Sequence, residues 1–297
     1  MADDDASEMA RGGVQRVPET FGLRLRYAVA GLVFFLGYRL FGLRRAVIRG
    51  NLVRSFPQFT ASERNRVRVD FVRRQSELLA ELDYSRALTA AELRQRVRVV
   101  DPQGVLAASD RIVLVAGHQC NFEWLLLRLS LEMGSSMVCV YKQMNSTWAE
   151  NYFRGIRAKF GAVLLPSTQI RQQLRSIRNA RAFGLVADQV PRTSPERHWT
   201  RFLHQETAFF MGPERMARLL RARTVYLSLR RTGRGLYEVV LEPLTTAGER
   251  LAEGEVTERY ARALERDINA DPGGWWWSHK RWKKLKEGRE GREGQEG

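Results

Sequence analysis

The 297-residue chain is predicted to fold as an α/β domain with a mostly parallel central sheet, flanking helices and one antiparallel hairpin. Short apolar runs alternate with longer segments whose apolar residues recur at helical spacing, a pattern typical of parallel strands joined by right-handed crossovers. The hydrophobic content of 44% and charged content of 28% are those of an ordinary globular protein that buries a sizeable core.

The N-terminal region is expected to differ from the folded domain. Residues 1–20 include the acidic run Asp3-Asp4-Asp5 and are expected to be disordered. Residues 21–50 contain the charge-free stretch from Tyr27 to Tyr38, which arginines flank on both sides. This stretch is shorter than the ~20 apolar residues that span a bilayer, so we expect a membrane-anchor helix that inserts partly or spans with strain. A buried amphipathic core helix is the alternative.

The folded domain is predicted over residues 51–285. Capping signals at Thr60-Ala61-Ser62-Glu63 and at Thr89-Ala90-Ala91-Glu92 open two helices. The predicted strands are Ile112–Ala116, Met137–Tyr141, Ala162–Leu165, Ala182–Ala187, Thr224–Arg230 and Leu236–Leu241, of which the last two form the hairpin. The predicted helices are Asn121–Met133, Ser146–Phe160, Thr168–Asn179, Pro213–Ala222 and Glu258–Asn269. A polar loop is expected after Asp188, and residues 286–297 are expected to be disordered.

The formal net charge of +16 predicts an anionic partner, such as nucleic acid, anionic lipid head groups, phosphorylated glycolipids or an acidic carrier protein. No helix-turn-helix, zinc-finger or RNA-binding aromatic motif is found, so nucleic acid is not a predicted partner. Near the C-terminus, Trp275-Trp276-Trp277 and Trp282 lie beside a cluster of cations. This composition suits a membrane interface, although stacking on single-stranded nucleic acid has similar requirements.

The strongest catalytic signal is Gly117-His118-Gln119-Cys120-Asn121-Phe122-Glu123. His118 follows a predicted buried strand, and Glu123 falls in the first turn of the next predicted helix. A carboxylate that accepts from one ring nitrogen leaves the other nitrogen able to take a proton from an alcohol. The sequence therefore predicts a His118–Glu123 general-base dyad; a merely structural histidine is the alternative.

Two cysteines, Cys120 and Cys139, do not make a disulfide framework or a multi-cysteine zinc site. Cys120 is interpreted as a residue that lines the site. No metal and no cofactor are predicted.

Further residues lie at the ends of predicted elements: Lys142 and Asp188 after strands, and Arg157 near the end of a helix. With His118, Lys142 and Asp188 would open toward one edge of the sheet, where α/β folds bind ligands. Arg157 is the best candidate for binding an oxyanion or phosphate, because guanidinium holds such groups bidentately. Arg157 could equally complement a helix dipole, and Asp188 could bind acceptor groups or cap its loop.

These motifs, together with Arg49-Gly50-Asn51-Leu52, Phe209-x-x-Gly212 and the closing Trp-Ser-His-Lys-Arg-Trp-Lys, resemble those of the lipid A biosynthesis acyltransferases of the lysophospholipid acyltransferase superfamily. The resemblance covers nearly the whole chain. It implies transfer of a fatty acyl chain from an acyl carrier protein thioester to a hydroxyl of a lipid A precursor, on the cytoplasmic side of the inner membrane. Such chemistry needs a general base and oxyanion stabilisation, with no metal or redox cofactor.

Three other readings stay open. The same chemistry could serve another acceptor, such as a lysophospholipid, an aminolipid or a glycosylated phosphatidylinositol. A basic binding protein without catalysis would also explain the charge and the tryptophans. A hydrolase would use His118 to activate water.

Overall fold

A computed structural model describes residues 17–42, 44–173, 177, 179–190, 197–246, 248–249 and 251–282. Of the terminal segments that we expect to be disordered, 1–20 and 286–297, residues 1–16 and 286–297 lie outside the described residues, and Thr20 caps the first described helix.

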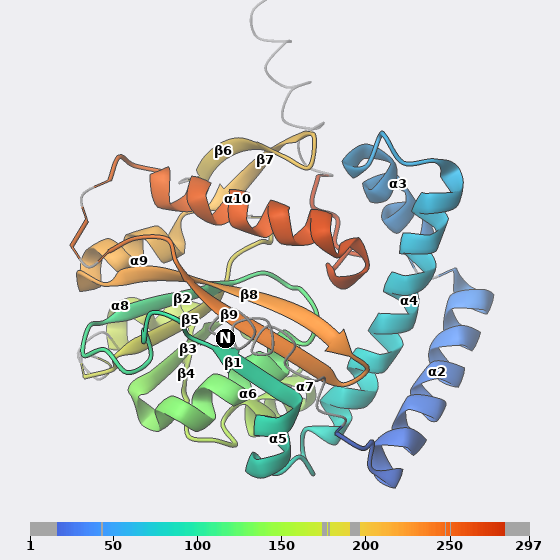
Figure 1. Cartoon of the computed structure of the whole chain (residues 1–297), viewed down its shortest axis with the longest axis horizontal. Helices are drawn as coiled ribbons and strands as arrows, with labels where there is room; N and C mark the ends of the chain where they lie inside the picture. Colours follow the sequence, from blue (N-terminus) through green and yellow to red (C-terminus); the bar gives the residue numbers. More distant parts are fainter. Residues whose placement is uncertain are drawn as a thin grey trace, which may run out of the picture.

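A seven-stranded sheet forms the centre of the molecule, in the order β1-β9-β8-β2-β5-β3-β4 (Figure 1). Its strands are β1 (Val97–Val100), β2 (Ile112–Ala116), β3 (Met137–Tyr141), β4 (Val163–Pro166), β5 (Ala182–Val186), β8 (Arg223–Gly233) and β9 (Leu236–Pro243). Neighbouring strands are parallel except β8 and β9, which form the antiparallel hairpin. The predicted sheet is therefore confirmed, and β1 is a strand that the sequence analysis missed.

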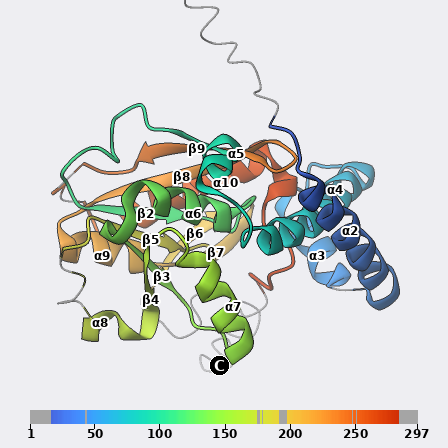
Figure 2. The same ribbon diagram turned by 90° about the horizontal axis from the view of Figure 1, so that it is seen from below.

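Helices cover both faces of the sheet. Strand β2 alternates between them: Ile112 and Leu114 contact the cluster that contains α6, while Val115 contacts the cluster that contains α10. Figures 1 and 2 place α5 and α6 on one face and α10 on the other. The helices after the N-terminal region are α4 (Ala61–Tyr84), α5 (Ala90–Arg96), α6 (Phe122–Met133), α7 (Thr147–Arg157), α8 (Ile170–Gln173), α9 (Gly212–Leu220) and α10 (Glu255–Ala270), with 3-10 turns at Gly134–Ser136, Ser167–Gln169 and Pro272–Gly274.

The segment expected to be a polar loop contains a second, two-stranded sheet. Strands β6 (Arg197–Phe202) and β7 (Gln205–Phe210) pair antiparallel and pack against α10. The turn between them consists of Leu203 and His204, both with positive φ, 48° and 62°. Such turns usually carry Asn-Gly or Asp-Gly, so this sequence gave no hairpin signal.

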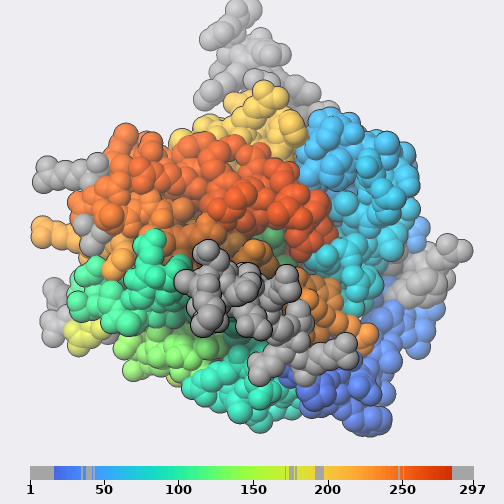
Figure 3. All heavy atoms as spheres, viewed as in Figure 1, coloured from blue at the N-terminus to red at the C-terminus, as the bar shows by residue number. Residues whose placement is uncertain are grey.

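The N-terminal region forms two helices rather than one. Helix α2 (Phe21–Phe41) ends at Gly42, whose φ of 58° is left-handed, and α3 (Arg45–Ser55) follows. Both pack beside α4 at one side of the molecule (Figures 1 and 3). Leu23 and Tyr27 of α2 are buried, 0% and 5% exposed. Among the described helices, none combines the length and apolarity that crossing a bilayer requires.

The opposite face of α2 remains apolar and open. Its exposed fractions include 60% for Leu32 and 63% for Val33. The exposed apolar residues of α2 are Phe21, Leu25, Val29, Leu32, Val33 and Leu36, and we call them the α2 stripe.

The tryptophans near the C-terminus are mostly in the core. Trp275, Trp277 and Trp282 are buried. Trp275 packs edge-on against Trp277 and Phe202. The prediction that these indole rings face a membrane interface is therefore wrong for these three residues. Aromatic composition did not distinguish a lipid-facing cluster from an internal one.

Candidate active site

His118 lies just beyond the carboxyl end of β2, at the centre of the sheet. In the parallel pairing of β2 with β5, Ala116 lies opposite Val186. The residues that follow each strand therefore meet, and these include His118 and Asp188. Gly117 fits here because a Cβ atom at this position would lie 2.6 Å from Leu264 Cδ1 of α10. The predicted common edge of the strand ends is present in the structure.

Asp188 holds the histidine at two points. Its Oδ1 lies 2.5 Å from His118 Nδ1, and its Oδ2 accepts from the backbone N–H of His118 at 2.9 Å. Trp275 Nε1 also donates to Oδ2, at 2.8 Å. Burial alone would raise the pKa of the Asp188 carboxyl, but the charge and hydrogen bonds of His118 and the bond from Trp275 outweigh burial and lower the pKa to about 2. The carboxylate is thus ionised at neutral pH and fixes the imidazole orientation.

The second ring nitrogen of His118 faces Gln189. The distance between His118 Nε2 and Gln189 Nε2 is 3.1 Å. Phe122 and Trp276 contact the imidazole edge-on, with ring centroids 4.9 and 5.9 Å away. The histidine side chain is 19% exposed, so it is confined without being sealed from solvent.

Glu123 does not take the position predicted for it. Asn121 caps α6 by accepting from Trp124 N–H at 2.9 Å, which places Glu123 in the first turn as expected. Its carboxylate, however, binds Arg157 of α7 bidentately through Nε and Nη2. The partner at His118 Nδ1 is Asp188, so the expected His118–Glu123 hydrogen bond is replaced by one from a neighbouring strand. Spacing within one motif did not reveal this partner.

Arg157 is a buried cation, with a side chain 17% exposed. Its guanidinium carbon lies 5.3 Å from the ring centre of Phe153 and 5.7 Å from that of Tyr141. Burial lowers the pKa of Arg157, but the hydrogen bonds and charge of Glu123 outweigh burial and raise it. Arg157 is therefore paired with a carboxylate of the protein, whereas the sequence analysis considered it as a cation for binding a substrate oxyanion or phosphate.

Lys142 follows β3 and is exposed. Among the described residues, its ammonium group has no hydrogen-bond or ion-pair partner. It remains a candidate for contact with an anionic substrate at the same edge of the sheet.

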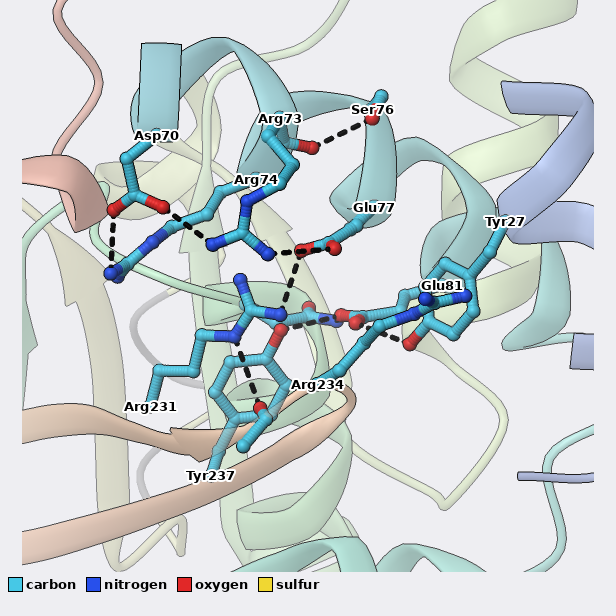
Figure 4. Close-up of polar contacts among 12 residues, drawn as sticks. Tyr27, Asp70, Arg73, Arg74, Ser76, Glu77, Glu81, Arg231, Arg234 and Tyr237 are labelled. Atoms are coloured by element: carbon cyan, nitrogen blue, oxygen red, sulfur yellow. Dashed lines mark hydrogen bonds and ion pairs between the residues drawn. The ribbon is translucent and has the colours of Figure 1, made fainter. Parts of the chain in front are cut away.

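The turn between β2 and α6, which carries His118, is held in place by Glu81 of α4. The Glu81 side chain is fully buried, 0% exposed. Its carboxylate accepts from the Tyr27 hydroxyl at 2.8 Å, the Tyr237 hydroxyl at 2.7 Å and Asn121 Nδ2 at 2.6 Å. Figure 4 shows the two tyrosines converging on it. Burial raises the pKa of Glu81 more than these hydrogen bonds lower it. The capping residue of α6 is thereby tied to α2, α4 and β9.

Other potential ligands or nucleophiles do not gather at the site. Among the described residues, no cluster of three or more His, Cys, Asp or Glu side chains is arranged to hold a metal. Burial raises the pKa of the Cys120 thiol to about 12, which keeps it protonated. His198 pairs with Glu258 instead, its Nε2 lying 2.7 Å from Oε2.

Three residues of the site were not assigned to it from the sequence. Gln189 was not considered as a site residue, and Trp275 and Trp276 were interpreted as part of an interface cluster. Their proximity to His118 depends on the parallel pairing of β2 with β5 and on an isolated bridge between Gln119 and Trp275. Neither feature has a local sequence signal.

A histidine oriented by a carboxylate, with its second nitrogen near the edge of the sheet where α/β folds bind ligands, is an arrangement that can act as a general base. The bacterial lipid A biosynthesis acyltransferase model matches residues 13–284. The chain therefore belongs to this family, and it is an O-acyltransferase.

Among solved structures, the chain matches the 1-acyl-sn-glycerophosphate (LPA) acyltransferase PlsC from Thermotoga maritima. The two chains are 13% identical, with a TM-score of 0.39, and the match covers 83% of this chain and 97% of that one. No curated protein matches the chain.

Proposed function

We propose that this enzyme transfers a fatty acyl chain from an acyl carrier protein thioester to a hydroxyl of a lipid A precursor, with His118 as the general base. The observation that carries the proposal is the pair of contacts on His118. Asp188 contacts Nδ1, and Nε2 faces the side-chain amide of Gln189 at an exposed position, where a hydrogen-bonding group of a substrate could replace it. Family membership supports the acyl transfer, and the donor and acceptor are those that the resemblance implies.

The reaction would proceed in two proton transfers. His118 Nε2 takes the proton of the acceptor hydroxyl as its oxygen attacks the thioester carbonyl, forming a tetrahedral intermediate. The intermediate then expels the carrier thiolate, which takes the proton back from the imidazolium. The products are an ester and a free thiol. Asp188 stabilises the transient imidazolium, since its carboxylate lies 2.5 Å from Nδ1.

Glu123 and Arg157 serve this reaction as a pair. Their bidentate contact joins the start of α6 to the end of α7 beside the base. We propose that Glu123 positions the catalytic turn and Arg157 rather than orienting the imidazole. Arg157 Nη1 makes no hydrogen bond given for the described residues, so it could still contact a substrate oxygen, and exposed Lys142 could bind an acceptor phosphate.

We propose that the enzyme works at the cytoplasmic surface of the inner membrane. The α2 stripe supports this, since apolar side chains aligned on one helix face suit the head-group boundary of a bilayer. The net charge of +16 favours anionic lipid, an acidic carrier protein and a phosphorylated acceptor alike.

The deciding experiment incubates the purified protein with acyl carrier protein thioesters and a lipid A precursor, and measures lipid masses. We expect the precursor to gain the mass of one acyl chain and a lysophospholipid to gain none. Acylation of the lysophospholipid instead would contradict the proposed acceptor.

His118→Ala is expected to lower kcat/KM by roughly 1,000-fold or more, because the general base is lost. His198→Ala is the matched control, since it removes another histidine paired with a carboxylate, and it should leave turnover unchanged. Turnover by His118→Ala near the parent rate would contradict the mechanism.

A further inference from the structure

The base nitrogen of the proposed mechanism already has a partner within the protein. Gln189 Nε2 lies 3.1 Å from His118 Nε2, the atom that must receive the proton of the acceptor hydroxyl. Gln189 directly follows Asp188 after β5, so the two ring nitrogens of His118 are contacted by consecutive residues.

The chemistry of Asp188 fixes the direction of this contact. A carboxylate only accepts hydrogen bonds, so in the neutral imidazole, the form that can act as a base, the proton lies on Nδ1 and Nε2 presents a lone pair. The group of Gln189 that faces this lone pair must therefore be the amide NH2, which donates. An alcohol or a water molecule would donate to the same lone pair, so the Gln189 amide takes the position of the nucleophile.

Two aromatic rings flank the imidazole beside Gln189. Phe122 and Trp276 pack edge-on against the imidazole and lie 6.0 Å apart between ring centroids. Gln189 is exposed. Among the described residues, its side chain hydrogen-bonds with His118. It can therefore turn aside without disturbing the core.

We propose that Gln189 substitutes for the acceptor hydroxyl on His118 until the lipid binds, and so limits hydrolysis of the donor thioester. The inference rests on the proposed function, because it assumes that His118 Nε2 is the base. A water molecule gains only one hydrogen bond to His118 Nε2 when it displaces the Gln189 amide. A lipid acceptor brings the binding energy of its whole surface, which can offset the lost hydrogen bond.

The reaction that Gln189 limits is a balanced side reaction of the same site. Water would give one proton to His118 Nε2 while its oxygen attacks the thioester carbonyl. The carbon–sulfur bond then breaks, the thiolate takes the proton from the imidazolium, and the products are a fatty acid and the carrier thiol. Gln189 therefore affects the ratio of transfer to hydrolysis.

The test compares the full chain with Gln189→Ala and Gln189→Met, using a lauroyl-carrier-protein thioester without acceptor. Methionine has a similar length but cannot donate a hydrogen bond. We expect thiol release to rise roughly 3- to 10-fold in both variants, the range of one net hydrogen bond. Transfer to the lipid acceptor should change less than hydrolysis. Gln95→Ala, an exposed glutamine of α5, is the control and should change neither rate.

A second measurement does not depend on turnover. Diethyl pyrocarbonate acylates an imidazole nitrogen that has an available lone pair, so His118 should react at least about 3-fold faster in Gln189→Ala, because the competing hydrogen bond is gone. Equal thiol release and equal His118 reactivity in parent and variant would overturn the inference. If the parent consumes no carrier thioester at all, the proposed donor is wrong, and the His118 reactivity alone then decides the role of Gln189.

Discussion

Asp188 is the residue on which the geometry of the base depends. It accepts from Nδ1 and the backbone N–H of His118 and from the Trp275 indole, while itself 3% exposed. We expect Asp188→Asn to lower kcat by roughly 100- to 10,000-fold, because an amide at this position favours the wrong imidazole tautomer. Steady-state kinetics with the carrier thioester measures the loss. Asp267→Asn, a buried aspartate bound to Tyr226 and Ser228, is the control.

The same residue predicts a pH dependence of stability. The Asp188 pKa is lowered in the folded protein from 3.8 to about 2, so the ionised form is favoured by folding. Its stabilisation is complete above the ordinary pKa and is lost as the pH falls through about 2. The difference in unfolding free energy between the parent and Asp188→Asn should therefore shrink between about pH 4 and pH 2. A difference that stays constant over this range would contradict the assignment.

For single residues, the sequence pointed to His118, the proposed base, but not to the carboxylate that contacts it. His118 could be predicted because it follows a buried apolar run. Asp188 was named as a candidate, but its contact with Nδ1 depends on which strands are neighbours. Strands β2 and β5 are neighbours in the sheet although β3 and β4 lie between them in the chain. Glu123 was given that role on local spacing, whereas a more distant arginine on α7 holds its carboxylate.

The helices α6 and α7 are joined by the Glu123–Arg157 ion pair, whose side chains are 6% and 17% exposed. We expect Glu123→Leu or Arg157→Met alone to cost about 3–5 kcal/mol of unfolding free energy, because each leaves the other charge buried without a partner. The double variant should be more stable than either single one. Urea-induced unfolding measures all three.

The exposed ion pair Arg26–Asp83 is the control for these single and double variants. Its removal should cost less than about 1 kcal/mol, as is usual for surface ion pairs. Single variants of Glu123 and Arg157 that cost no more than this would show that the buried pair does not hold the two helices together.

Elements with strong periodic or capping signals were predicted well. The limits of β2 and β3 agree with the prediction, and α4 begins after the capping box at Thr60. The elements that were missed lack such signals. Strands β6 and β7 have no regular alternation of polar and apolar residues and flank a turn without glycine or asparagine, and β1 is short. The expected long N-terminal helix breaks at Gly42, because the chain adopts a left-handed conformation there.

At the scale of the whole molecule, the α2 stripe is exposed at one side of the protein, while the opposite face of α2 packs into the core. We expect Leu32→Glu combined with Val33→Glu to weaken binding to anionic phospholipid vesicles by at least about tenfold, because two exposed apolar side chains would no longer enter the head-group boundary. Vesicle sedimentation measures this. Leu219→Glu on α9 changes a leucine that is 65% exposed elsewhere and is the control. Equal sedimentation of the parent and the double variant would contradict a membrane role for α2.

The C-terminal segment completes the catalytic turn. Gly274 O accepts from Cys120 N–H at 2.9 Å, Trp275 binds Asp188, and Trp276 contacts the His118 ring. During synthesis, residues 117–123 leave the ribosome more than a hundred residues before these partners exist. The emerging chain can therefore form much of its sheet while its histidine still lacks a finished environment. Activity arises late in biosynthesis, and a protease that removed residues 274–282 would abolish it while cutting far from the histidine in sequence.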